Sequence, residues 1–440
     1  MNPTTVLIIL CSLLLQAASG AAQTKPNIVF ILTDDQGYGD VGKHGHPLLK
    51  TPNLDALHDQ SVRFEQFYVS PSCSPTRAEL LTGMHEFKNG VTHTTDPRVH
   101  LNKDAVILPQ LLKSAGYRTG IIGKWHLGNA GEYAPSKRGF DWCSTNAGGP
   151  NEHFDPMFIM NNKRMKRQGY REDLFFDDAM TFIDESKGTP FFCYLSTYSP
   201  HAPLAAPEEF VAPFRGKVDE EEAKFLGMVA NLDYNLGRLM AHLRERKLDE
   251  NTILVFMNDN GETHGLDVYN AGMRGSKCTI WQGGYRAMSF WKWAGKWQPH
   301  EVQNLTAHLD VLPTLCDLAG VTLNVGHLIR LGFNGPSEFT LHGSKGLVTA
   351  ERMSLGPNGV LNFVLDSDGA GLIKLRDTLM RHPGAKVEID GTLYRGGARV
   401  IPLVVNGSNL NDGRRFTPQQ VRFEGFAGLM PRPGITPRGS

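Results

Sequence analysis

The stretch NIVFILTDDQG, residues 27–37, decides the fold of this 440-residue chain. It begins with a run of mostly apolar, branched residues and ends in Asp34, Asp35 and Gly37. An uninterrupted apolar run of this length, closed by a polar turn, is typical of a strand that is buried on both faces. Such a strand belongs to a sheet that is covered by helices on both sides.

The same arrangement recurs further along the chain, where stretches with helical periodicity each precede another apolar run. The helical stretches are 104–115, 173–187 and 220–247, and the runs are TGIIGKWHLG (119–128), PFFCYLSTYSPHAP (190–203) and TILVFMNDNG (252–261). Alternation of helix and strand predicts an α/β fold with a mostly parallel central sheet flanked by helices.

Polar residues follow the predicted strands at the points where the strands end. They are Asp34 and Asp35, Lys124 and His126, His201, and Asp259 and Asn260. In open sheets of this kind, ligands bind beyond the carboxyl ends of the strands. We therefore expect four segments that are distant in sequence to meet at one rim of the sheet.

The pattern changes beyond Val321, where helical periodicity fades. Short β-like runs, such as GVLNFVLD (359–366) and ARVIPLVV (398–405), lie between Gly and Asn/Asp turns. We expect residues 24–320 to form the principal domain and residues 321–440 to form a smaller, β-rich region.

The first residues have the character of a secretory signal. An apolar run from Val6 to Leu15 precedes small residues at positions 17–22, so we expect residues 1–23 to be cleaved. The run is shorter than the roughly 20 apolar residues that span a bilayer. The sequence thus predicts export, to a periplasm, the extracellular space or a lysosomal or secretory compartment, without stable membrane insertion.

Charge balance argues against a nucleic-acid partner. The 45 basic and 45 acidic residues cancel, and no run of like charge stands out. Any preference for an anion must therefore be local.

Cysteine usage directs attention to one residue. Loss of Cys11 with the signal leaves five cysteines, an odd number that does not suggest a disulfide framework. Cys73 opens the segment CSPTRAELLTG, residues 73–83, in which Pro75 is suited to the first turn of a helix. Cys73 would then lie at a helix N-terminus, where unpaired N–H groups favour negative charge.

This segment resembles the signature of the type I sulfatases, CxPxR followed by xxLxTG. In that family a maturation enzyme oxidises the cysteine to formylglycine (3-oxoalanine). Cys73 alone would be read as an ordinary buried thiol. The residues that match in register are Cys73, Pro75, Arg77, Leu80, Thr82 and Gly83.

The resemblance extends from about Lys25 to Val321 and implies one Ca²⁺ per site. The implied metal ligands are Asp34, Asp35, Asp259, Asn260 and residue 73 in its modified form. Oxygen ligands suit Ca²⁺ and argue against zinc. An aspartate pair at one strand end is by itself more often a turn or a helix cap.

The resemblance also implies roles in catalysis for Cys73, Arg77, Lys124, His126, His201 and Lys277. By this resemblance, hydrated formylglycine at position 73 would attack sulfur after Asp259 removes its proton. His201, with Lys277, would protonate the leaving alcohol, and His126 would take the proton of the second hydroxyl as sulfate leaves. Lys124 and Arg77 hold the formylglycine and stabilise charge.

The implied reaction is hydrolysis of a sulfate monoester, on a sulfated small molecule or polysaccharide, or on an aryl sulfate. Two alternatives stay open: a phosphate or phosphonate ester hydrolase of the alkaline phosphatase superfamily, and a sulfatase-like protein that binds without catalysis. The C-terminal sheet segments of the family have no recognisable match in residues 322–440. That region is divergent, an unrelated fusion or the product of an altered frame.

Overall fold

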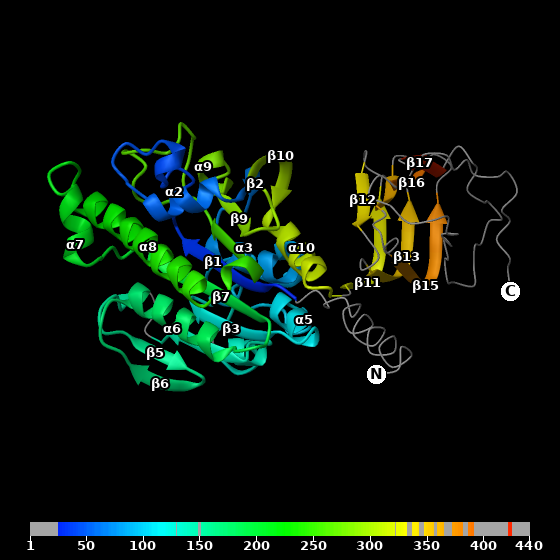
Figure 1. The fold of residues 1–440 in the computed structure, drawn as a ribbon, viewed down its shortest axis with the longest axis horizontal. Coiled ribbons are helices and arrows are strands. Elements are labelled where there is room, and N and C mark those ends of the chain that lie inside the picture. Colours follow the sequence, from blue (N-terminus) through cyan, green and yellow to red (C-terminus); the bar gives the residue numbers. More distant parts are fainter. Residues whose placement is uncertain are drawn as a thin grey trace, which may run out of the picture. The chain divides into compact units, whose positions relative to one another are not determined.

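The fold is known from a computed structural model (Figure 1) that describes residues 25–128, 130–147 and 151–321 in full. Beyond them it describes the backbone of strands between residues 323 and 424. The expected signal, residues 1–23, lies outside the described residues. The chain divides into two compact units, Met1–Ala319 and Gly320–Ser440.

A ten-stranded sheet forms the centre of the first unit, in the order β10-β2-β9-β8-β1-β7-β3-β4-β5-β6. The strands are β1 (Asn27–Asp34), β2 (Val62–Tyr68), β3 (Arg118–Gly123), β4 (Trp142–Asn146), β5 (Met157–Met160), β6 (Lys163–Lys166), β7 (Phe191–Pro200), β8 (Thr252–Asn258), β9 (Ser289–Trp293) and β10 (His300–Ala307). All eight residues of β1 are buried, as a strand in the middle of a covered sheet requires.

The expected parallel core is confirmed. Strand β1 pairs in parallel with β8 on one side and β7 on the other, and β7, β3 and β4 continue in the same direction. The two flanks are mixed, because β9 runs antiparallel between β8 and β2, and β4, β5 and β6 form an antiparallel meander. Between β5 and β6 lie Asn161 and Asn162, with φ of 47° and 70°, the left-handed pair that a two-residue hairpin needs.

Helices cover both faces of the sheet (Figure 1). On one face lie α2 (Pro52–Asp59), α6 (Arg171–Glu185) and α8 (Glu220–Glu245), and on the other α3 (Cys73–Thr82), α5 (Leu108–Ser114) and α10 (Val311–Leu318). Short helices are α4 (Glu86–Asn89), α7 (Glu208–Val211) and α9 (Gln282–Tyr285). Val29 and Ile31 of β1 pack with Phe175 of α6 and Leu236 of α8 in one core cluster.

The predicted helices are present with small shifts at their ends. The stretch expected from residue 104 begins as α5 only at Leu108, where Pro109 fits the first turn and the Gln110 side chain accepts the Ile107 N–H at 3.0 Å. Helix α8 begins where expected, because the Asp219 side chain accepts the Glu222 N–H at 2.9 Å.

The second unit contains strands that pair in parallel in two sheets, ordered β11-β13-β15 and β12-β14-β16-β17. The described strands are β11 (Leu323–Leu331), β12 (Ser337–His342), β13 (Leu347–Leu355), β14 (Gly359–Val364), β15 (Leu372–Arg381), β16 (Lys386–Asp390) and β17 (Val421–Glu424). The run expected at 359–366 contains β14, and the run at 398–405 lies outside the described residues.

Among the helices of the described residues, none has the length and apolar character that crossing a membrane demands.

Candidate active site

Cys73 is the first residue of α3, and its side chain is 2% exposed. Ser72 precedes it in an extended conformation, and Gly83 ends the helix with a φ of 63°. Pro75 lies within the first turn, where a missing N–H removes no helical hydrogen bond. Every residue of α3 is buried, and the start of the helix lies beside the carboxyl ends of the strands.

His126 faces this cysteine, with its Nδ1 3.5 Å from Cys73 Sγ. Its other ring nitrogen, Nε2, lies 3.0 Å from the carbonyl oxygen of Thr94. A carbonyl can only accept, so Nε2 carries the proton and Nδ1 presents a lone pair to residue 73. Burial, with the nearby charges of Lys124 and Arg77, lowers the pKa of His126 to about 3, which keeps the ring neutral.

Three buried carboxylates gather beside Cys73: Asp34, Asp35 and Asp259. Asp35 has a φ of 61°, and its N–H donates to Asp259 Oδ1 at 3.2 Å. Asn260 donates to Asp35 Oδ1 at 2.7 Å. Ligand atoms of Asp34, Cys73 and Asp259 lie within 4.8 Å of one another. Two strand ends thus converge on the start of α3.

These residues fit a hard divalent cation. Asp34 Oδ1 and Asn260 Oδ1 are buried and accept no hydrogen bond, although an unpaired buried oxygen is costly. Carboxylate and amide oxygens are the ligands that Ca²⁺ prefers. The thiol of Cys73 is the one soft donor of the set, and its replacement by an oxygen would make the shell uniform.

Three buried or nearly buried cations oppose the three carboxylates. Arg77 Nη2 lies 2.7 Å from Asp259 Oδ2 and 3.7 Å from Asp34 Oδ1. Lys124 Nζ donates to Asp34 Oδ2 at 2.5 Å, and Lys277 Nζ lies 2.6 Å from Asp35 Oδ1. The charges of the site balance when all three carboxylates are ionised, so an added divalent cation would leave an excess that suits an anionic ester.

The carboxylates differ in acidity because of these neighbours. Burial alone would raise the pKa of Asp34, but Lys124, His201 and Arg77 hold it well below its usual value. Burial and the negative charge of Asp34 raise the pKa of Asp259 to about 7. Asp259 is thus the carboxylate best placed to exchange a proton near neutral pH.

His201 and Lys277 lie on the solvent side of the group. Their side chains are 26% and 12% exposed, against 5% for Lys124. His201 Nε2 is 3.7 Å from Asp35 Oδ2, and its Nδ1 lies 2.5 Å from the Ala202 carbonyl oxygen, which it can only reach as a donor. Both side chains are therefore accessible to a substrate that approaches from solvent.

The structure brings together all ten residues that the sequence predicts for catalysis or metal binding. They are Asp34, Asp35, Cys73, Arg77, Lys124, His126, His201, Asp259, Asn260 and Lys277. Two further residues take part that sequence reasoning missed. Arg77 Nη1 donates to the hydroxyl of Ser196, and the Thr94 carbonyl fixes the His126 ring. A serine near the end of a buried strand and a backbone carbonyl in a loop carry no distinctive sequence signal.

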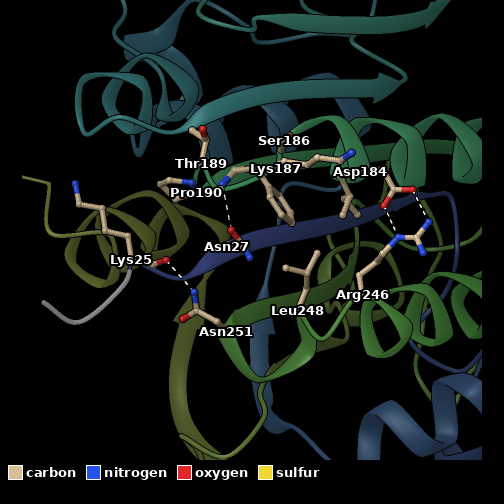
Figure 2. Close-up of a pocket in the computed structure, with 13 residues that line it drawn as sticks. Lys25, Asn27, Asp184, Ser186, Lys187, Thr189, Pro190, Arg246, Leu248 and Asn251 are labelled. Carbon is tan, nitrogen blue, oxygen red and sulfur yellow. Dashed lines mark hydrogen bonds and ion pairs between the residues drawn. The ribbon is translucent and has the colours of Figure 1, made fainter. Parts of the chain in front are cut away.

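A hollow of about 690 Å³ lies elsewhere, at the amino end of the parallel strands (Figure 2). Its walls include Asn27 and Phe191, the first residues of β1 and β7, and the ion pair of Asp184 with Arg246 at 2.7 Å. None of the ten residues lines it. Because Asp34 ends the strand that Asn27 begins, this hollow is not the candidate active site.

A mostly parallel ten-stranded sheet between helices, with buried carboxylates at the carboxyl ends of its strands, has the alkaline phosphatase-like α/β fold. Solved structures agree. The protein named Ps i-CgsB, in complex with k-i-k-neocarrahexaose, is 32% identical with a TM-score of 0.64, over 68% of this chain and 73% of that one. A Bacteroides thetaiotaomicron protein described under metabolism of multiple glycosaminoglycans is 25% identical with a TM-score of 0.60, over 68% and 78%.

The family model named Sulfatase matches residues 26–321, and the chain belongs to the sulfatase family. Human arylsulfatase A is 33% identical over 350 residues, which are 71% of this chain and 68% of that protein. Human N-acetylgalactosamine-6-sulfatase is 32% identical over 344 residues, 69% and 64% of the two chains. Mouse arylsulfatase J is 31% identical over 297 residues, 62% and 49%. The chain thus spans about half to two thirds of the length of these relatives.

Proposed function

We propose that the protein hydrolyses sulfate monoesters with formylglycine at position 73 as nucleophile and Ca²⁺ as cofactor. Asp34, Asp35, Asp259, Asn260 and residue 73 would hold the ion. When bound, Ca²⁺ would supply positive charge to the sulfate oxygens and favour the ionised nucleophile. The observation that carries the proposal is the position of Cys73, which lies at a helix start between Asp34 and Asp259 with the lone pair of His126 directed at it.

The chain's own residues would divide the proton transfers among them. Asp259 would take the proton of the attacking hydroxyl on residue 73 as that oxygen bonds to sulfur. His201 and Lys277 would donate a proton to the leaving alcohol oxygen from the solvent side. His126 Nδ1 would then accept the proton of the second hydroxyl on residue 73, as the bond to sulfate breaks and the aldehyde returns.

Arg77 and Lys124 would hold the carboxylates of Asp259 and Asp34 in position and would not transfer protons. Arg77 is fully buried and joins Asp259 to the hydroxyl of Ser196, and Lys124 lies against Asp34. Buried charges of both signs, held by hydrogen bonds, provide fixed positive potential where the sulfate oxygens gain charge.

Substrates and partners follow from the same proposal. Relatives named arylsulfatase and N-acetylgalactosamine-6-sulfatase support a sulfated glycan or an aryl sulfate as substrate. A maturation enzyme that converts Cys73 is the required partner. We also propose that residues 1–23 direct export and that residues 24–320 form the catalytic domain, followed by a distinct region over residues 321–440.

Mass spectrometry of the peptide that contains Cys73 tests the modification. Conversion to the aldehyde lowers the mass by roughly 18 Da relative to the thiol. Protein made together with a maturation enzyme should show this loss, and the Cys73→Ala variant should not. Thiol alone in such protein would refute the mechanism.

Parallel assays on 4-nitrophenyl sulfate, 4-nitrophenyl phosphate and phenylphosphonate esters test the reaction. The proposal expects the sulfate ester to be turned over fastest, in a manner that needs Ca²⁺. Faster turnover of a phosphorus ester would favour the phosphate or phosphonate hydrolase, and no turnover by protein with modified Cys73 would favour a binding protein.

A further inference from the structure

The segment that carries Lys277 also presents an exposed aromatic ring. Trp281 is 42% exposed, whereas Trp291 and Trp293, which lie in strand β9, are 4% and 8% exposed. The guanidinium carbon of Arg274 lies 3.8 Å from the centre of the Trp281 ring. The two side chains form one composite surface, named here the Arg274–Trp281 platform.

The loop that bears this platform is fixed at its base. The Gly283 N–H donates to the Arg274 carbonyl at 2.9 Å, which closes the loop next to Trp281. Inside the loop, the Ser276 N–H donates to the hydroxyl of Thr279 at 3.1 Å. A ring held in this manner loses little conformational entropy when it binds a ligand.

Gly275 lets the ring pack closely against the loop. It has a φ of 86°, and a Cβ at this position would lie 2.4 Å from Thr279 Oγ1 and 2.7 Å from the Cβ of Trp281. Only a glycine satisfies both the conformation and the space. The platform is therefore preorganised by the sequence of its own loop.

Contacts at the tip of the loop tie the platform to the candidate active site. The Lys277 N–H donates to the Glu262 carbonyl at 3.1 Å, and the Cys278 N–H donates to the Pro71 carbonyl at 2.7 Å, two residues before Cys73. The Lys277 side chain lies on Asp35. Arg274 and Trp281 thus stand on either side of Lys277 in the sequence of one loop, and the Lys277 side chain belongs to the candidate active site.

The platform carries the positive charge of Arg274, which lies over the Trp281 ring. In the part of the chain that the structure describes, no carboxylate forms an ion pair with Arg274. The flat face of an indole packs against the C–H face of a sugar ring, and a guanidinium forms paired hydrogen bonds with sulfate oxygens. Together they match one sulfated pyranose.

We infer that the Arg274–Trp281 platform is a subsite for a second sulfated sugar, adjacent to the one that is hydrolysed, so that the substrate is a sulfated glycan of at least two residues. The inference rests on the proposed function for the identity of the neighbouring site. The subsite itself depends only on the exposed ring, on a guanidinium that forms no ion pair with a carboxylate of the described residues, and on the fixed loop.

Dextran sulfate is the probe, and its binding to the full-length matured protein is measured by isothermal titration calorimetry. The variants Trp281→Ala and Arg274→Ala should each weaken binding on the order of tenfold, and Arg274→Ala should also reduce its dependence on salt. Arg244→Ala and Phe87→Ala are matched controls, because Arg244 is exposed at the end of α8 and Phe87 is 79% exposed on α4. They should bind as the unchanged protein does.

Kinetics with 4-nitrophenyl sulfate separate a subsite from a structural role. Both platform variants should retain kcat and KM for this small ester within about twofold, while dextran sulfate should inhibit them less than it inhibits the unchanged protein. Equal dextran sulfate binding by all variants would overturn the inference, as would an equal loss in the controls or a collapse of 4-nitrophenyl sulfate turnover in the platform variants. Platform-dependent binding without any turnover of the sulfate ester would overturn the proposed function and leave the subsite standing.

Discussion

Arg77 shows how one side chain orders the candidate site. It is fully buried and pairs with Asp259 at 2.7 Å, while its other nitrogen, Nη1, donates to the Lys124 carbonyl at 3.4 Å and to the hydroxyl of Ser196. A planar guanidinium reaches three acceptors in fixed directions, which an ammonium cannot do. The geometry thus explains an arginine at this position.

The Arg77→Lys substitution should therefore be severe despite the retained charge. We expect a loss of about 3 kcal/mol in unfolding free energy, because acceptors remain buried without donors, and at least a hundredfold loss of kcat. Chemical denaturation and 4-nitrophenyl sulfate kinetics measure the two effects. Arg118→Lys, which changes a surface ion pair with Glu185, is the matched control. It should change the unfolding free energy and kcat very little. Comparable behaviour of the two variants would contradict this account of Arg77.

His126 should affect only the second half of the reaction, because its lone pair faces residue 73 rather than solvent. In the His126→Ala variant we expect one equivalent of 4-nitrophenol to be released rapidly, followed by a stall with sulfate retained on residue 73. Rapid-quench kinetics and intact-protein mass spectrometry would detect the burst and the adduct. A variant that slows the burst itself would show that His126 acts in the first step instead.

At the scale of elements, Glu79 fastens α3 to the segments that surround it. Its carboxylate lies 2.5 Å from His308 Nε2, accepts the Ser70 hydroxyl at 2.5 Å and accepts the Glu86 N–H at 2.8 Å. His308 begins the short 3-10 turn His308–Asp310, which leads into α10. Its Nδ1 lies 3.0 Å from the Tyr68 carbonyl at the end of β2. One buried side chain thus holds the helix of Cys73 in place.

This network should make stability depend on pH in the acid range. Burial alone would raise the pKa of Glu79, but the contact with His308 holds it below its usual value of 4.5. The unfolded chain therefore binds more protons below that pH, so the contribution is complete above it and is lost as pH falls through the lowered pKa. The Glu79→Gln variant should be less stable by about 2 kcal/mol at pH 7 and by clearly less in the acid range.

Urea denaturation at a series of pH values measures this difference. Glu185→Gln, at an exposed ion pair, serves as the control and should show almost no change at any pH. A constant deficit for Glu79→Gln across the acid range would mean that packing, and not charge, carries the contribution.

At the scale of the whole molecule, the sequence predicted the parallel centre of the sheet, which is confirmed, and a set of residues that the structure brings together in the candidate site. A buried run such as 27–33 followed by polar residues recurs in several segments, and parallel strands bring such ends to one edge. What escaped prediction depends on contacts between distant segments. The carbonyl of Thr94 reaches His126 only through the path of a loop, and the antiparallel β9 has no pattern that distinguishes it from a parallel strand.

Removal of the metal should lower the thermal stability of the entire first unit, because the proposed ligands come from β1, α3 and the end of β8. A ligand at a hundred times its Kd stabilises a fold by about 2.7 kcal/mol, so chelation should lower the melting temperature by several degrees. Differential scanning calorimetry in EDTA and after Ca²⁺ is restored measures the shift. The Asp34→Asn variant should melt at one temperature under both conditions, and an identical melt of the unchanged protein with and without Ca²⁺ would speak against a bound ion.

Strand β6, which forms one of the two edges of the sheet, carries an unusual number of charges. All four of its residues, Lys163–Lys166, are exposed, and three of them are cationic, on a strand whose outer edge pairs with no other strand of the described residues. A second molecule that approached with the same strand would meet like charges at the separation of hydrogen-bonded neighbours. The molecule thus resists growth of its sheet into fibres at this edge, a safeguard that matters most at the high local concentrations of a crowded compartment.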